Sequence, residues 1–401
     1  MRYFTTTLFF ALLSLASSAA EPTPRYFSAK PGSLVKAKAQ LDAGDKALAK
    51  ALKKLVKDAD KALAEPLPSV MSKAKLPPSG DKHDYMSIAP YFWPNPETKD
   101  GMPYVRHDGK VNPESRDPKA NDSPAIKIMG DNVETLALAY YFTGNETYAQ
   151  GAAKVARTWF LDPATRMNPH LKYAQAIMGV NDGRGTGILE ALNLSVAVDA
   201  LGLLANSEAW PKADQQALKE WLSTYHDWLI QSDPGKDEHS AKNNHGTFYD
   251  VQAVRIALVL GRDESAKRML EEAKQGRIAV QIDPEGKQPL ELDRTTSFSY
   301  SRFNLDALCE LATLGEHAGV DLWNFSTEDG RSIRKAIDFM LPYADVPPKP
   351  WTLPQIKDKH ESEFMPIFRQ ATLAFGTDAY EAIIAKYEDS PSKRFQLTMP
   401  R

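Results

Sequence analysis

The feature that most constrains the fold is a succession of helical patterns running from Ile128 to the C-terminal region. Apolar residues recur there at helical spacing, and the segments end at Gly, Asn or Pro, as in YYFTGNE and LVLGRDES. The expected helices are 130–143, 146–160, 186–205, 211–231, 247–261, 264–277, 301–318, 330–344, 360–374 and 377–388. Strand signals are sparse, and the clearest is RIAVQIDPEGKQPLEL, residues 277–292, which suits a β-hairpin turning at residues 284–286.

Many helices joined by short loops favour an all-α fold. We expect paired helices that close into an α/α toroid, an incomplete barrel of about six to seven helical hairpins whose loops at one rim shape a cleft. An open α-solenoid is the competing architecture. Another helical pair is expected ahead of this region, over residues 33–64, with a break near Gly44.

A segment that cannot be regular helix separates these helical regions. Eleven of the 28 prolines lie between Pro66 and Pro124, around SIAPYFWPNPETKDGMPYVRHDGKVNPESRD. Its aromatic residues argue against disorder. We therefore expect a long Pro- and aromatic-rich loop region, either an ordered loop or a few short extended pieces.

The N-terminal residues MRYFTTTLFFALLSLASSAAEP have the features of a secretory signal peptide. One Arg is followed by an apolar run, Leu8–Leu15, and by small residues. We expect a signal peptide over residues 1–20 and a single mature domain over residues 21–401. The apolar run is too short to span a bilayer, and no later segment is expected to be long and apolar enough. The protein is therefore expected to be secreted (extracellular or periplasmic), with no membrane association after signal removal.

Composition and missing motifs exclude several classes of function. The net charge of −3 gives no global basic field for nucleic acid, so a polyanionic ligand would need a local basic cleft. The single cysteine, Cys309, permits no intrachain disulfide. G-x-S-x-G, P-loop, H-E-x-x-H and C-x-x-C motifs are absent, so we expect no metal and no cofactor. The expected oligomeric state is a monomer.

The first candidate for chemistry is the stretch AKNNHGTFYD, residues 241–250. Asn243 is expected to cap the helix that follows. Asn244 and His245 then lie at or just before the helix N-terminus, where free N–H groups and the helix dipole favour an anion. On its own, His245 would more often be a structural histidine.

The second candidate is LELDRTTSFSYSRFNLDALCELATL, in which Arg294 and Tyr300 precede another expected helix that Ser297 or Ser299 can cap. Both clusters occupy equivalent positions relative to their helices. A toroid therefore places them on the same rim, where Asn, His, Arg and Tyr converge without a carboxylate pair.

NNHGTFYD followed by ELDRTTSFSYSRFNL resembles the alginate lyase domain family, polysaccharide lyases with an α/α-toroid fold. APYFWPNP, PYVRHDGKVNPE and YAQAIMGVNDGRGTGI are similar to secreted members, nearest to polysaccharide lyase family thirty-eight and more distantly to family five. The resemblance covers roughly residues 80–375. In family five a His follows the second-motif Tyr, whereas Ser301 follows Tyr300 here.

The resemblance implies a secreted lyase acting on an acidic polysaccharide, a 1,4-linked polyuronate such as mannuronate-rich alginate or β-1,4-glucuronan. It assigns carboxylate neutralisation to Asn244 and proton transfer to His245 and Tyr300. Arg294 takes the role of orienting the tyrosine and the substrate.

The chemistry of β-elimination fits these residue types. The enzyme removes the C5 proton, which is α to a carboxylate, and expels the C4 oxygen, so a donor must neutralise the carboxylate. A nearby Arg or protonated His would favour the tyrosinate. In mannuronate or glucuronate the C5 proton and O4 share a face, so Tyr300 can serve as base and then acid. In guluronate they lie on opposite faces, and His245 would be the base.

Four further residues are candidates for substrate binding. Tyr91 and Trp93 can stack on sugar rings, or can form local core in the Pro-rich loop. Gln175 and Arg184, in a loop between two expected helices, can contact a uronate carboxylate or hydroxyl.

Two rival functions remain open from the sequence. An α/α-toroid glycoside hydrolase would need two carboxylates about 5–10 Å apart across the cleft. Glu190 and Glu291 are possible acids, although a salt bridge is the simpler account of one of them. A non-catalytic carbohydrate-binding protein could keep Tyr91 and Trp93, but would have no reason to keep Tyr300 beside an arginine.

Overall fold

A computed structural model describes residues 24–387 and 395–401. The predicted signal peptide, residues 1–20, lies outside the described residues. The longer helices in chain order are α1 (Ser33–Asp42), α2 (Lys46–Ala64), α3 (Ser123–Thr143), α4 (Glu146–Ala156), α5 (Leu192–Ala200), α6 (Lys212–Gln231), α7 (Asp233–Ser240), α8 (Asn244–Leu260), α9 (Asp263–Ala273), α12 (Ser297–Ala318), α13 (Ile333–Met340) and α14 (Met365–Phe375). Short helices are α10 (Ala279–Gln281), α11 (Pro289–Leu292), α15 (Glu381–Lys386) and α16 (Phe395–Thr398).

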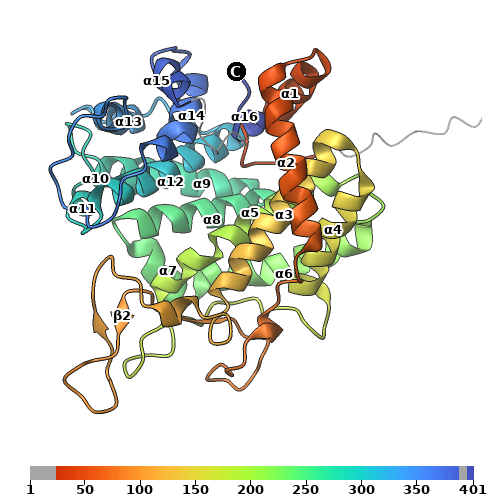
Figure 1. The fold of residues 1–401 in the computed structure, drawn as a ribbon, viewed down its shortest axis with the longest axis vertical. Helices are drawn as coiled ribbons and strands as arrows, with labels where there is room; N and C mark the ends of the chain where they lie inside the picture. Colours follow the sequence, from red (N-terminus) through yellow and green to blue (C-terminus); the bar gives the residue numbers. More distant parts are fainter. Residues whose placement is uncertain (1–23, 388–394) are drawn as a thin grey trace, which may run out of the picture.

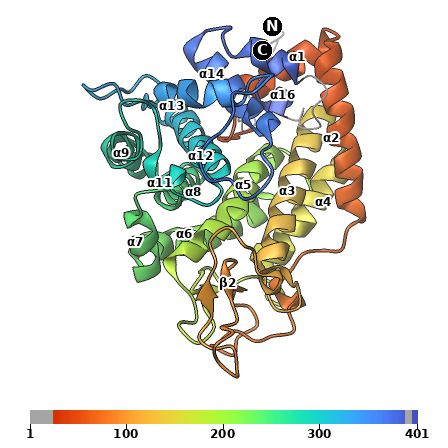
Figure 2. The same cartoon turned by 60° about the vertical axis from the view of Figure 1, so that its left-hand side comes forward.

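The helices form an inner and an outer set (Figures 1 and 2). Helices α3, α5, α8 and α12 are buried on most of their faces and pack against one another in the order α3–α5–α8–α12. Helices α4, α6 and α9 cover them from outside and bury one face each. This arrangement is the α/α toroid that the succession of helical patterns predicts.

Most predicted helices are present, and the predicted pair over residues 33–64 is formed by α1 and α2 with Gly44 between them at φ 89°. The predicted β-hairpin over residues 277–292 is wrong. A π-helical turn, η6 (Lys274–Ile278), continues into α10, and α11 follows the turn that the chain does make at Pro284-Glu285. The buried Ile278 and Ile282 are held against the helical core, which overrides their β propensity.

The Pro-rich region consists of short pieces, as predicted. They are η1 (Val70–Ser72), β1 (Met86–Ile88), β2 (Phe92–Trp93), β3 (Val105–Arg106) and η2 (Pro113–Arg116). Strand β1 pairs in parallel with β4 (Tyr173–Ala176), and β2 pairs with β3 in an antiparallel hairpin. Figures 1 and 2 show this hairpin projecting beyond the helices at one end of the toroid.

One segment, Gly185–Leu204, is long and apolar enough to cross a membrane by length and composition. The expectation that no such segment follows the N-terminal run is therefore wrong. In the most apolar 18-residue stretch of this segment, 67% is buried inside the protein. It includes α5 in the inner set of helices, and packing in the core explains its composition.

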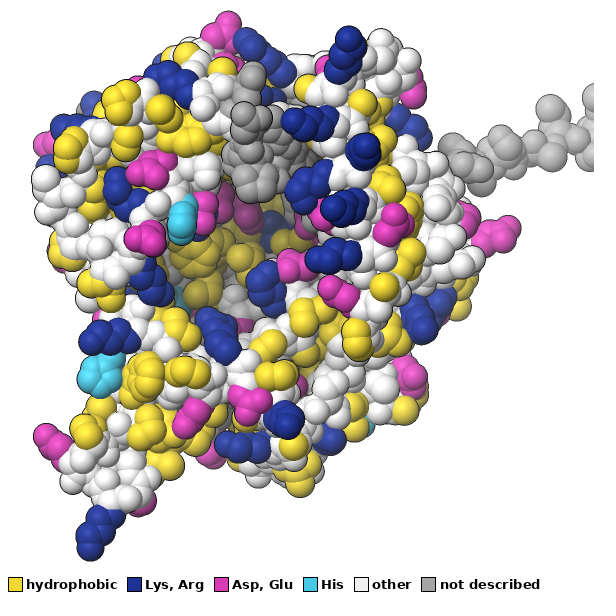
Figure 3. Space-filling model, viewed as in Figure 1, with side chains coloured by type: hydrophobic (Ala, Val, Ile, Leu, Met, Phe, Trp, Pro, Cys, Tyr) yellow, Lys and Arg dark blue, Asp and Glu magenta, His cyan; other side chains and the backbone are white. Residues whose placement is uncertain are grey.

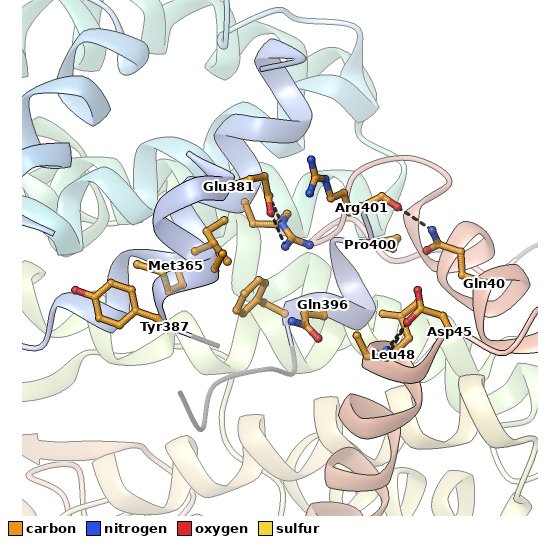
Figure 4. Close-up of a pocket in the computed structure, with 14 residues that line it drawn as sticks. Gln40, Asp45, Leu48, Met365, Glu381, Tyr387, Gln396, Pro400 and Arg401 are labelled. Atoms are coloured by element: carbon orange, nitrogen blue, oxygen red, sulfur yellow. Dashed lines mark hydrogen bonds and ion pairs between the residues drawn. The ribbon is translucent and has the colours of Figure 1, made fainter. Parts of the chain in front are cut away.

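The C-terminal end packs back onto the first helical pair (Figure 4). Helix α16 contacts α1 and α2, and the Gln40 side-chain amide donates to the Arg401 carbonyl at 2.8 Å. A pocket opens between these elements and α14, with the buried Arg369–Glu381 ion pair in its wall. None of the residues predicted for the site lines this pocket.

Candidate active site

A cleft of about 1040 Å³ opens where the Pro-rich hairpin meets the starts of α8 and α12. Seven of the predicted site residues line it: Tyr91, Gln175, Arg184, Asn244, His245, Arg294 and Tyr300. The segment 356–363, between α13 and α14, forms part of its wall. Figure 3 shows the face of the molecule seen in Figure 1, which is hollowed near its centre.

The start of α8 is built as the sequence predicts. The Asn243 side chain caps the helix by accepting the His245 N–H at 3.2 Å, which places Asn244 and His245 in the first helical turn. The connection from α7 is fixed by a buried ion pair in which Arg277 donates to Asp250 at 2.8 Å and also to the Ala241 carbonyl. The half-site on α8 is thus held rigidly by the helical core.

His245 is oriented by a buried carboxylate on α7. Its Nδ1 lies 2.7 Å from Oε1 of Glu238, a residue that is 2% exposed. Because the carboxylate accepts the Nδ1 proton, it fixes the tautomer and leaves Nε2, on the other side of the ring, available in the cleft. The imidazole is therefore set to exchange a proton at Nε2.

Asn244 is held by a second buried carboxylate, Glu291 on α11. Glu291 accepts the Asn244 backbone N–H at 2.7 Å and the side-chain amide at 2.9 Å through each of its two oxygens. Burial raises the Glu291 pKa, while its hydrogen bonds with Asn244 oppose that rise. The sequence favoured a salt bridge for one of Glu190 and Glu291, whereas Glu291 is held by hydrogen bonds from an amide.

The α12 half-site differs from the prediction in one respect. The helix starts at Ser297 and has no side-chain cap, so Tyr300 lies in its first turn instead of preceding it. The start of the helix is held by the chain between α13 and α14, since the Ser297 N–H and hydroxyl both donate to the Pro354 carbonyl. Arg294 lies just before the helix, as expected.

Arg294 is clamped by Asp108 from the Pro-rich region. Its Nη2 and Nε donate to the two carboxylate oxygens at 2.7 and 3.2 Å, and its guanidinium carbon lies 3.7 Å from the centroid of the Tyr300 ring. Burial raises the Asp108 pKa, but the hydrogen bonds and charge of Arg294 outweigh it and lower that pKa to about 2. Asp108 is thus ionised at neutral pH and fixes Arg294 against the tyrosine.

Tyr300 makes its hydroxyl contact with Tyr91, at 2.8 Å, where either oxygen can be the donor. Burial is the main cause that raises the Tyr300 pKa, and Tyr91 adds to it. Arg294 lowers this pKa, as expected, but is outweighed. Tyr300 is therefore a neutral phenol in the free protein. Tyr91, predicted as a sugar platform, is also the direct partner of the candidate base.

Gln175 and Arg184 form one unit in the lining of the cleft. Arg184 donates to the Gln175 side-chain oxygen at 2.7 Å and lies over the Phe92 ring at 5.2 Å, while its buried Nε has no hydrogen-bond partner. Gln175 has φ 51°, a strained value for a residue other than glycine. An unpaired guanidinium N–H beside a cleft is suited to bind a carboxylate.

The structure does not bring Trp93 to the cleft. Successive side chains of a strand point to opposite faces, so Phe92 of β2 lines the cleft while Trp93 faces away. The Trp93 indole N–H donates to the Lys110 carbonyl at 2.9 Å and so braces the β2–β3 hairpin. The sequence left two roles open for Trp93, stacking on a sugar ring or packing within the Pro-rich loop, and the structure supports packing.

The cleft is locally basic although the chain is slightly acidic. Its basic lining side chains are Arg106, Arg116, Arg184, Arg294, Arg302 and Lys357, against the acidic Glu190, Asp358 and Glu363. Glu190 is half-buried and accepts hydrogen bonds from the hydroxyls of Tyr85 and Ser87. The cleft thus supplies the local positive field that a polyanionic ligand needs.

Two residues that orient the site were not identified from the sequence. Asp108 lies in PYVRHDGKVNPE, one of the motifs that carries the resemblance, but nothing in the sequence pairs it with Arg294. Glu238 precedes His245 by seven positions, in a helix that was not predicted. The Ser-Asp-Pro at residues 232–234 was the available signal for that helix, because Ser232 caps it and Pro234 lies in its first turn.

The fold and the cleft define a class: an α/α-toroid protein with an Asn-His pair and an Arg-Tyr pair in a basic cleft. The alginate lyase family model matches residues 69–351. The chain therefore belongs to the alginate lyase family and is a polysaccharide lyase. A comparison with curated proteins finds no match.

Solved structures agree with this membership. An alginate lyase from Bacteroides ovatus is 40% identical, with a TM-score of 0.89 over 94% of this chain and 99% of that one. Alginate lyase A1-III from Sphingomonas species A1 shares the fold at 16% identity, with a TM-score of 0.59 over 94% of this chain and 97% of that one. A histidine-to-alanine variant of A1-III in complex with a tetrasaccharide matches with a TM-score of 0.63 and 16% identity, over 96% of this chain and 98% of that one.

Proposed function

We propose that the protein is a secreted, metal-independent lyase that cleaves mannuronate-rich alginate by β-elimination and leaves a 4,5-unsaturated uronate end. The observation that carries this proposal is the contact of Tyr300 with both Arg294 and Tyr91 in the cleft that Asn244 and His245 also line. β-1,4-Glucuronan is the second candidate polymer, because its C5 proton and O4 have the same relative orientation as in mannuronate.

Each group has a role in the proposed reaction. Asn244 and Arg294 neutralise the uronate carboxylate, which acidifies the C5 proton. Tyr300 removes that proton as a phenolate and returns a proton to the departing O4. Because Tyr300 is a neutral phenol in the free protein, it must first lose its proton, and the half-buried Tyr91 hydroxyl offers a route to solvent. His245 supplies a second proton-transfer group through Nε2.

Arg184 and Gln175 extend the site beyond the reacting residue. The Arg184 guanidinium, which lines the cleft, is proposed to bind the carboxylate of a neighbouring uronate, with Gln175 holding it in place. The basic side chains around the cleft support binding of an acidic polysaccharide. The protein is proposed to act as a monomer.

A panel of polymers tests the proposal. Mannuronate-rich and guluronate-rich alginate blocks and glucuronan are incubated with the protein, and both reducing ends and the ultraviolet absorbance of the unsaturated uronate are followed. We expect absorbance to rise in step with reducing ends, fastest on mannuronate-rich blocks. Fastest turnover of guluronate-rich blocks would contradict the proposed role of Tyr300, and no product from any polymer would favour a binding protein.

A further inference from the structure

The Asn244 side chain has an unusual hydrogen-bonding state. Its amide nitrogen is 2.9 Å from both oxygens of Glu291, while its own oxygen, Oδ1, is buried and has no partner. Asn244 is 0% exposed and Glu291 1% exposed; Asn244 lines the cleft, and Glu291 lies behind it. In this state the amide nitrogen that a substrate carboxylate would need as a donor is engaged with Glu291.

We propose that Glu291 is a positioning residue that must carry a proton when substrate is bound. A neutral carboxyl keeps one oxygen as acceptor for the Asn244 backbone N–H, and its O–H donates to Oδ1 of Asn244. The amide is then rotated by half a turn, and its NH₂ group faces the cleft. This inference rests on the proposed function, because it explains how Asn244 becomes a donor to the uronate carboxylate.

The proton is taken from solvent when the polymer binds, and the carboxyl O–H is the only bond that forms. Ionised Glu291 and a uronate carboxylate would otherwise compete for the same amide protons. The protonated state also gives the orphaned Oδ1 a donor, so all polar atoms of Asn244 are then paired. An amide's oxygen and nitrogen are distinguished only by such hydrogen bonds, so both orientations fit the same side-chain position.

The surroundings of Glu291 allow a neutral carboxyl. The charged or titratable groups facing it are Arg294, from the chain just after α11, and His245 from α8. Neither is hydrogen-bonded to it, since Arg294 donates its side-chain protons to Asp108 and His245 donates through Nδ1 to Glu238. Burial outweighs these two charges and raises the Glu291 pKa.

The pH dependence of KM tests the inference. With Glu291 neutral in the complex, the wild-type KM for mannuronate-rich alginate rises by up to tenfold per pH unit above the free-enzyme pKa of Glu291. Glu291→Gln mimics the neutral carboxyl, since its amide can donate to Oδ1 of Asn244 and its oxygen can accept the backbone N–H. We expect this variant to retain lyase activity with a KM that no longer changes with pH in that range.

Glu190→Gln is the matched control, because it makes the same change at a half-buried carboxyl that lines the cleft and is hydrogen-bonded to Tyr85 and Ser87. It should keep the wild-type slope of KM against pH. A folded Glu291→Gln protein that fails to bind alginate at every pH would overturn the inference. Inactivity of the wild type on every polyuronate would instead overturn the proposed function.

Calorimetry provides a test if Glu291→Gln does not fold. Tetramannuronate is titrated into the Tyr300→Phe variant in buffers of different ionisation enthalpy, at successive pH values from about 5 to 9. We expect uptake approaching one proton per site once Glu291 is ionised in the free protein. Binding without proton uptake across the whole range would overturn the inference.

Discussion

The two walls of the cleft hold their reactive groups in different ways. On the α8 wall, Asn244 and His245 lie in a capped first helical turn, and their partners Glu291 and Glu238 are buried in the toroid. On the α12 wall, Arg294 and Tyr300 depend on partners from the Pro-rich region, 186 and 209 residues away in sequence. One wall is preorganised by the core, whereas the other is assembled only when the Pro-rich hairpin packs onto the toroid.

This difference predicts that breaking the α12 wall reduces activity while the helical fold survives. Breaking contacts on the α8 wall should affect stability as well, because those partners belong to the core. The four substitutions below run from the largest expected effect to the smallest.

Tyr300→Phe removes the proposed base and acid, and we expect kcat to fall by about 10³-fold or more. The wild-type kcat should also depend on pH. Because the Tyr300 pKa is raised above its usual value, the fraction of Tyr300 present as phenolate grows as pH rises, and kcat should rise with it. Residual activity of the variant should lack this rise. Unsaturated product is measured by initial rates of absorbance, with circular dichroism as the control for folding. A variant with wild-type kcat would remove Tyr300 from the reaction.

Asp108→Asn breaks the charged clamp on Arg294, and we expect kcat/KM to fall by about 10²-fold while the helical fold is retained. The matched control is Asp329→Asn, which removes the carboxylate from an exposed ion pair with Arg331 and should leave activity unchanged. Equal losses in the two variants would show that the clamp has no special role.

The ion pair of Asp108 with Arg294 also predicts how the stability of the protein depends on pH. The folded-state pKa of Asp108, about 2, is below its unfolded value, so its contribution is present above the unfolded pKa and is lost as pH falls toward 2. The unfolding free energy of Asp108→Asn should therefore depend less on pH than that of the wild type in this acid range.

Glu238→Gln tests the α8 wall. The imidazole of His245 keeps its place on the helix but loses the charged acceptor at Nδ1, so we expect about a tenfold fall in kcat. Because Glu238 is buried, the melting temperature should also fall, and by more than that of Asp108→Asn. An unchanged kcat would show that the tautomer of His245 does not matter for turnover on mannuronate.

Asn243→Ala removes the helix cap at the start of α8. We expect the free energy of unfolding to fall by about 1 kcal/mol, the usual contribution of such a cap. Denaturant unfolding measures this change. A loss well below that value would show that Glu291 alone holds the first turn, through the Asn244 backbone N–H.

The sequence predicts the α8 wall better than the α12 wall for the same physical reason. Helical periodicity and an Asn cap are local signals, and they place Asn244 and His245 at or just before the start of a helix, which in the structure begins at Asn244. The clamp of Asp108 on Arg294 and the Tyr91–Tyr300 contact are long-range and leave no periodic trace. The family resemblance supplied Arg294 and Tyr300, but not the residues that hold them.

Two further differences have local causes. The segment 277–292 has the composition of strands, yet it is helical on both sides of its turn, and packing of Ile278 and Ile282 accounts for the first side. Trp93 and Tyr91 look equivalent in the sequence, but Tyr91 precedes strand β2 and contacts Tyr300, while Trp93 faces away from the cleft and braces the hairpin. Side-chain direction in so short a strand is set by its pairing with β3.

The central claim is that the residues of both walls catalyse a single β-elimination, in which no water molecule is consumed. The most direct measurement is the mass spectrum of products formed from a mannuronate oligosaccharide of defined length in water enriched in heavy oxygen. The account predicts fragments whose masses sum to that of the substrate, one of them an unsaturated uronate, with no heavy oxygen incorporated. Fragments that together gain one molecule of labelled water would show hydrolysis and contradict it.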